Sequence, residues 1–200
     1  MLLCALIAIV LNSSAFAQII TDGSDNILSV TIPFGNLTPG TSTTPASTQV
    51  QFRIRSNSNN GYKVQASATF NVMGAGPNDG GVTVSASDIG VGITGLVFGP
   101  AVKTPRADVI APGLNYNPAT VSAMNGLTPY AGMALGQATV ADILANPNMT
   151  ILSGPKIANN QHLNPPANMI TVTMTFGVVG QFFTPATLSG VLTLTIVDGP

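Results

Sequence analysis

The sequence predicts an all-β protein: an antiparallel β-sandwich with a long irregular central excursion that carries one short helix. Several segments alternate between apolar and polar residues with a period of two, which is the pattern of half-buried strands. Turn-forming Gly, Pro, Asn and Ser cluster between these segments, as in sandwiches built from short strands. The chain of 200 residues has seven Asp, no Glu and six Lys plus Arg. Because Glu and Lys are common on the solvent face of helices, their scarcity argues against long surface helices.

Alternation is clearest in two regions of the N-terminal half. In residues 27–34 the apolar side chains share one face: Leu28, Val30, Ile32 and Phe34. Residues 49–70 contain two more alternating segments, separated by a polar stretch that ends in Asn60-Gly61. Because Asn-Gly tolerates the positive φ of tight hairpin turns, we predict a β-hairpin over residues 49–70.

The C-terminal region repeats the pattern. Residues 170–178 and 191–197 alternate apolar side chains with Thr, so each is predicted to be a strand. Two shorter apolar segments, residues 82–84 and 89–98, are further candidate strands. Three glycines, at positions 90, 92 and 95, weaken the prediction for the second of them.

The middle of the chain has a different character. Residues 99–136 carry five prolines with many Gly and Asn, which excludes long regular elements there. Residues 139–145 read as a helix, with Thr139 as N-cap, Asp142 in the first turn and Asn146-Pro147 at the end. Residues 146–168 read as loop. With no second domain or internal repeat in view, residues 18–200 are predicted to form a single β-sandwich domain.

The first residues indicate export. An apolar run over residues 2–11 is followed by Ala15-Phe16-Ala17, a small-x-small cleavage pattern, so residues 1–17 are predicted to be a signal peptide. The run is too short for a transmembrane helix, which needs about 20 apolar residues, and the mature chain is expected to have no transmembrane span. The only cysteine, Cys4, lies in this segment, so the mature chain would have no thiol or disulfide. The expected location is secreted or at the cell surface.

Charge and composition narrow the partners. Charged residues make up 6% of the chain, the net charge is −1, and 45% of residues are hydrophobic. The exposed surface is therefore expected to consist of Thr, Ser, Asn and Gln, which suits β-structure. Nucleic-acid binding is not expected, because neutralising phosphates needs clustered Lys and Arg.

Catalytic equipment is not evident, and no enzyme activity is expected. The single histidine, His162, lies in a polar loop, and no Gly-x-Ser-x-Gly motif accompanies it. The Asp residues are scattered among turn formers, with no paired carboxylates close in sequence. Residues 22–26 and 78–81 are rich in oxygen ligands but lack the spacing of a calcium loop, so they are read as Asx turns. The sequence indicates no metal site and no cofactor.

Three weaker features suggest interaction surfaces. Phe182 and Phe183 are adjacent, so in a strand they point to opposite faces, and one must be exposed or covered by a loop or a partner chain. Tyr116 and Tyr130 lie in the irregular middle, where they would form the wall of a ligand site for glycans. Three cations of the expected hairpin would cluster on its polar side as an anion-contacting patch, or simply be solvated: Arg53, Arg55 and Lys63.

Several segments together resemble a known class of protein. These are the strand ending in Ile32-Pro33-Phe34-Gly35, the alternating segments on either side of Asn60-Gly61, and the closing strand within residues 189–196. They are similar to bacterial secreted β-sandwich surface subunits, of the fimbrial (pilin-like) or spore-coat-U-like type. The resemblance implies an immunoglobulin-like subunit that polymerises by lending a strand to its neighbour, a form of β-augmentation. The disulfide common in such subunits cannot form here.

We therefore expect an exported, non-catalytic structural or adhesive surface protein, a fimbrial-type subunit whose partners are other protein chains joined through strand pairing. The alternative is a secreted carbohydrate- or ligand-binding β-sandwich module. An assembling subunit should present an unpaired sheet edge, whereas a binding module should present a lined pocket. The partner, the ligand and the oligomeric state do not follow from the sequence.

Overall fold

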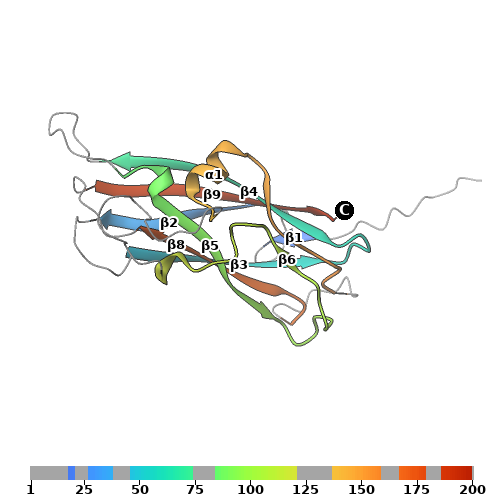
Figure 1. Cartoon of the computed structure of the whole chain (residues 1–200). Coiled ribbons are helices and arrows are strands. Elements are labelled where there is room, and N and C mark those ends of the chain that lie inside the picture. The colour runs from blue at the N-terminus through green and yellow to red at the C-terminus, as the bar shows by residue number, and fades with distance from the viewer. Residues whose placement is uncertain are drawn as a thin grey trace, which may run out of the picture.

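The computed structural model describes residues 18–20, 27–37, 46–73, 84–120, 137–158, 167–178 and 186–199. These residues form two antiparallel sheets packed face to face, with one short α-helix at the side (Figure 1). The all-β sandwich expected from the alternating segments is therefore confirmed. The predicted signal peptide, residues 1–17, lies outside the described residues.

The first sheet has four strands in the order β1-β3-β8-β5. Their bounds are β1 Gln18–Ile20, β3 Ala46–Ser56, β8 Ile170–Val178 and β5 Ile89–Phe98. Three of these strands were expected from the sequence. The three-residue strand β1, which pairs with the end of β3, was not.

The second sheet has five strands in the order β2-β9-β4-β7-β6. Their bounds are β2 Ile27–Leu37, β9 Ala186–Asp198, β4 Tyr62–Met73, β7 Met149–Gly154 and β6 Val109–Ile110. Strand β2 pairs with the C-terminal strand β9, and β9 also pairs with β4 along its whole length. The C-terminal strand β9 thus lies between β2 and β4.

The inward faces of the two sheets form one hydrophobic core. The alternation in β3 places Val50, Phe52 and Ile54 inside, each at most 3% exposed. The alternation in β9 does the same for Leu192, Leu194 and Ile196, each 0% exposed. Burying such side chains contributes about 1.5–3 kcal/mol each relative to leaving them exposed. The period-two pattern is therefore a direct record of which side chains enter the core.

The predicted hairpin over residues 49–70 is wrong in its pairing. Both strands form, but β3 pairs with β1 and β8 in one sheet, whereas β4 pairs with β7 and β9 in the other. The polar segment between them crosses from sheet to sheet and turns at Gly61, whose N–H donates to the Ser58 carbonyl at 3.1 Å and whose φ is +83°. Alternation could not distinguish the two arrangements, because strands in facing sheets and neighbouring strands in one sheet both bury every second residue.

One lateral side of the sandwich is closed by the central excursion. At β5 the bridge between Gly90 and Thr139 covers the outer edge. The outer edge of β7 is covered by β6, and the Ala111 N–H donates to the Ile151 carbonyl at 3.0 Å. Strand β7 itself contradicts the expected loop over residues 146–168. It occupies only six of those residues and carries little alternation, since the adjacent Ile151 and Leu152 are both buried.

The short helix α1, Val140–Ala145, is confirmed at the expected place. The Asp142 carboxylate accepts hydrogen bonds from the Thr139 N–H at 2.7 Å and the Thr139 hydroxyl at 2.8 Å. Val140 and Ile143 are buried and belong to the core cluster, so the helix is held by tertiary packing as well as by its cap. None of the helices in the described part of the chain is long and apolar enough to cross a membrane.

The excursion also lies across the outer face of the first sheet, where glycines make room for it. A Cβ at Gly92 would collide with the Tyr116 carbonyl, and a Cβ at Gly177 would come within 2.6 Å of the Pro118 carbonyl oxygen. Gly92 in β5 had counted against a strand. It is required because another backbone approaches that face closely. Val84 lies outside any strand, and the other two residues of the predicted strand 82–84 lie outside the described residues.

Candidate functional site

The side of the sandwich opposite the excursion has a different construction. Here β2 ends the second sheet, and β3 is bordered only by the three-residue strand β1 at its C-terminal end. Strands β2 and β3 contact each other across the two sheets. Among the described residues, no strand pairs with the outer edge of β2 or with that of β3 between positions 46 and 53. In the part of the chain that the structure describes, two neighbouring sheet edges are therefore unpaired.

The direction of the backbone groups in β3 follows from hydrogen bonds elsewhere in its sheet. In an antiparallel sheet, a residue directs its N–H and C=O to one side and the next residue directs them to the other. The Val91 N–H points out of the sheet edge, to the Ala138 carbonyl at 3.0 Å, so its β8 partner Phe176 points toward β3. Phe176 pairs with Thr48, and even-numbered residues of β3 therefore bond to β8. The odd-numbered residues direct their backbone groups outward: Ser47, Gln49, Gln51 and Arg53.

The same four residues carry the exposed side chains of β3, whereas Val50 and Phe52 are buried. One side-chain bond, from Gln51 Nε2 to Thr173 Oγ1 at 3.3 Å, ties this polar row to β8. We define the open edge as residues 47–53 of β3. Its odd-numbered residues direct backbone donors and acceptors outward. Its side chains form an apolar row that faces the core and a polar row that faces solvent.

Open edges are usually blunted by Pro, a bulge, inward charges or a covering segment, because they template pairing with other chains. Strand β2 carries Pro33, which has no N–H, and its register with β9 shifts between Ile32 and Gly35. Strands β5 and β7 are covered by the excursion. Strand β3 pairs with β8 without a register shift from Ala46 to Ile54 and contains no proline. Within the described residues, positions 47–53 have no proline, no register shift, no inward charge and no covering strand, and their single charged side chain is Arg53.

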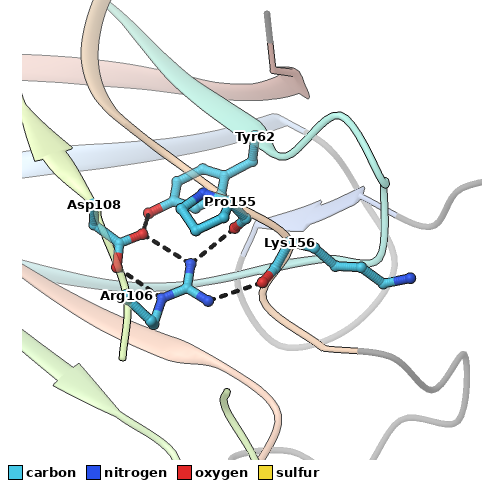
Figure 2. A network of polar contacts seen from close by, with 5 residues as sticks. All are labelled: Tyr62, Arg106, Asp108, Pro155 and Lys156. Atoms are coloured by element: carbon cyan, nitrogen blue, oxygen red, sulfur yellow. Dashed lines mark hydrogen bonds and ion pairs between the residues drawn. The ribbon is translucent and has the colours of Figure 1, made fainter. Parts of the chain in front are cut away.

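A second polar feature lies on the closed side, where Tyr62, Arg106 and Asp108 form a buried cluster (Figure 2). The Tyr62 hydroxyl donates to Asp108 Oδ1 at 2.7 Å. Arg106 forks onto the same carboxylate, with Nε at 2.7 Å from Oδ2 and Nη2 at 2.8 Å from Oδ1. The remaining guanidinium groups donate to the carbonyls of Lys156, at 2.9 Å, and Pro155, at 2.8 Å.

The chemistry of this cluster is structural. The side chains of Arg106 and Asp108 are each 3% exposed, and every strong donor and acceptor in the fork is engaged. Burial opposes the charge of Arg106, but the hydrogen bonds and charge of Asp108 outweigh it and raise the pKa of the guanidinium. Burial, reinforced by Asp108, also raises the pKa of Tyr62. A tyrosine held protonated and a saturated ion pair are suited to fastening the excursion to β4 and β7 rather than to proton transfer.

Of the four aromatic residues predicted for interaction sites, Tyr116 is the one within the described residues. The Tyr116 hydroxyl donates to the Ala138 carbonyl at 2.8 Å, so this side chain ties two parts of the excursion together. Burial raises the pKa of Tyr116 to about 12. Tyr130, Phe182 and Phe183 lie outside the described residues, as do His162 and the two oxygen-rich loops. Within the described segments, no three His, Cys, Asp or Glu side chains gather closely enough to hold a metal ion.

The three cations considered as an anion-contacting patch do not cluster. Arg53 is exposed on the first sheet, Lys63 lies on the second sheet, and Arg55 is 1% exposed. Burial lowers the pKa of Arg55. The patch was expected because the two strands were assigned to one hairpin. Once they belong to opposite sheets, their solvent faces point in opposite directions.

The sequence did not reveal the open edge or the buried cluster. The edge is defined by the absence of a neighbour, which depends on how all nine strands pair. A signal for the cluster did exist, because Arg106 and Asp108 are close in sequence in a chain with only thirteen Asp, Lys and Arg residues in total. In such a chain a neighbouring pair of opposite charges is a candidate for a buried ion pair. Its partner Tyr62, 46 residues away, follows only from the fold.

No family model, curated protein or solved structure matches this chain. The site is therefore interpreted from its own geometry.

Proposed function

We propose that this chain is an exported, non-catalytic structural or adhesive surface protein that assembles with other chains through strand pairing, as a fimbrial-type subunit does. The observation that carries the proposal is the open edge of β3, residues 47–53, which directs backbone groups outward and, among the described residues, has no proline, register shift or neighbouring strand. A strand added there would extend the first sheet by β-augmentation.

The character of the solvent face supports the same proposal. On the second sheet, polar residues align across three strands at the level of Ser29, Thr193 and Ser67. The Ser29 and Thr193 hydroxyls lie 3.5 Å apart. With a net charge of −1 and 6% charged residues, two copies of the chain would approach with little electrostatic repulsion. A net charge close to zero favours association between copies of a protein, and a structural subunit assembles by such association.

Two routes of strand pairing differ in the internal pairs that they break. Lending an N-terminal strand, as the resemblance implies, would require β2 to leave its own β9, with which it pairs from Ile27 to Leu37. Adding a strand at the open edge of β3 requires no internal pair to break. The second route is therefore favoured on energetic grounds.

The experiment has two readouts. First, cells expressing the whole chain are fractionated, and the mature N-terminus is sequenced; an exported product beginning at Gln18 is expected. Second, the purified product is followed by size-exclusion chromatography and negative-stain microscopy across a concentration series. Oligomers or fibres that grow with concentration are expected. Retention in the cytosol would contradict export, and a monomer at every concentration would contradict self-assembly and favour a ligand-binding module.

A further inference from the structure

We propose that the open edge of β3 takes a second copy of the same strand, in an antiparallel pair centred on Val50. The inference rests on the proposed function, since it names the partner and the register of the strand pairing. In this register Val50 faces Val50 of the second copy, Gln49 faces Gln51, and Ser47 faces Arg53.

The hydrogen-bond pattern restricts the register. Outward backbone groups belong to the odd-numbered residues from Ser47 to Arg53, and only a register that pairs odd with odd lets two such edges exchange bonds. Centring on Val50 matches all four outward residues of one copy with all four of the other. Each of these four pairs exchanges two N–H···O bonds. Displacing the centre by one residue loses at least one pair.

Strand β1 limits how far an incoming strand can pair along β3. Its residues Gln18, Ile19 and Ile20 already pair with Ser56, Arg55 and Ile54, so an incoming strand cannot extend past position 53. A register centred on Gln51 would place Ser47 of the second copy opposite Arg55, where β1 lies. The register centred on Val50 is therefore the one that pairs all of residues 47–53 without overlapping β1.

The side chains of the edge suit self-pairing. The exposed row contains Ser47, Gln49, Gln51 and a single charge at Arg53. In the Val50-centred register the two arginines face serines at opposite ends, so no like charges are opposed. On the inner side, Val50 meets Val50 of the second copy and Phe52 meets Thr48, which continues the apolar layer across the junction.

Cysteine cross-linking tests the register directly. The whole chain is expressed with Cys4→Ser, and two variants, Gln49→Cys and Gln51→Cys, carry different mass tags. Directly opposed residues in a bonded pair have Cα atoms about 5.5 Å apart, within disulfide range, whereas diagonal neighbours lie about 7–8 Å apart. Mixing the two variants should therefore give mainly the mixed 49–51 disulfide, several-fold faster than either variant alone. Thr69→Cys, exposed in the middle of the second sheet, is the matched control and should cross-link slowly.

A charge exchange supplies a second measurement that does not depend on disulfide chemistry. Lysines at both positions, Gln49→Lys with Gln51→Lys, oppose like charges twice per dimer and should weaken association about tenfold. The pair Gln49→Lys with Gln51→Glu opposes unlike charges and should restore it. Both variants alter only exposed side chains, so circular dichroism should show the same β content in each.

The outcomes separate this inference from the proposed function. Preferential 49–51 disulfides and recovery with Lys opposite Glu support it. Oligomers that form while the 49–51 disulfide is no faster than the 49–49 disulfide would overturn the self-pairing of β3 and leave strand-mediated assembly in place. A chain that stays monomeric at every concentration would overturn both.

Discussion

The Tyr62 hydroxyl donates a 2.7 Å hydrogen bond to Asp108, a residue 46 positions further along the chain. Tyr62 begins β4, and Asp108 immediately precedes β6. The bond therefore joins a central strand of the second sheet to the excursion that closes one side of the sandwich (Figure 2). Because Arg106 and Asp108 are buried together with it, the closure of that side depends on a small, fully paired polar cluster.

Replacing Asp108 should be among the most damaging single changes in the chain. Asp108→Asn leaves the Arg106 guanidinium buried without a counter-charge, and the free energy of unfolding should fall by about 3–5 kcal/mol. Urea denaturation followed by far-UV circular dichroism measures the change. Tyr62→Phe, which removes one hydrogen bond and keeps the ring, should cost about 1–2 kcal/mol.

The two charges can also be removed together. The double variant Arg106→Met with Asp108→Leu leaves no unpaired charge and should be more stable than Asp108→Asn alone. If the double variant were less stable than Asp108→Asn, the ion pair would make a net favourable contribution to the stability of the fold, contrary to this account.

The glycine beneath the excursion is predicted to be essential in β8. A Cβ at Gly177 would lie 2.6 Å from the Pro118 carbonyl oxygen, so Gly177→Ala should lower the free energy of unfolding by about 1–3 kcal/mol through overpacking. Gly95→Ala is the matched control, since its Cβ would meet Thr173 at an ordinary 3.5 Å. Thermal denaturation should show a lower Tm for the first variant and an unchanged or higher Tm for the second.

The crossing between the two sheets depends on Gly61. Its φ of +83° is strained for any residue with a side chain, and a Cβ there would collide with the Gly154 carbonyl. Gly61→Ala should therefore cost at least about 1–2 kcal/mol, measured by urea denaturation. Asn60→Ala, at an exposed neighbouring turn position, should change stability by less than about 0.5 kcal/mol. Equal effects at the two positions would argue against this turn geometry.

Stability should decline in strongly alkaline solution. Burial raises the pKa of Tyr116 to about 12, and the pKa of Tyr62 is raised as well. An unfolded tyrosine titrates near pH 10, so above about pH 10 the unfolded chain loses protons that the folded chain retains. The contribution of these two tyrosines to the free energy of unfolding should be constant below that pH and fall progressively between about pH 10 and about pH 12.

Urea midpoints measured on either side of this window test the prediction. Tyr116→Phe removes one of the two groups, so its stability should decline less steeply with pH than that of the unaltered chain. An identical decline in both proteins would assign the effect to other groups.

Much of the secondary structure could be predicted because alternation is a local record of burial. Residues 27–34, 89–98, 170–178 and 191–197 all lie in strands, and the helix over 139–145 was recognisable from Thr139 and Asp142. The errors have local causes as well. Strand β7 lacks alternation where Ile151 and Leu152 are both buried, and β1 is too short to show any.

From the sequence we could predict that this chain forms half-buried strands, which side of each alternating strand enters the core, and where the excursion interrupts them. The pairing of the strands follows only from the fold: β3 joins one sheet and β4 the other, so Arg53 and Lys63 lie on opposite sheets, and no described strand pairs with the outer edge of β3 between positions 46 and 53. The physical reason is that a period of two reports burial on one face. Strand partners are selected by long-range packing and backbone hydrogen bonds, which leave no period in the sequence.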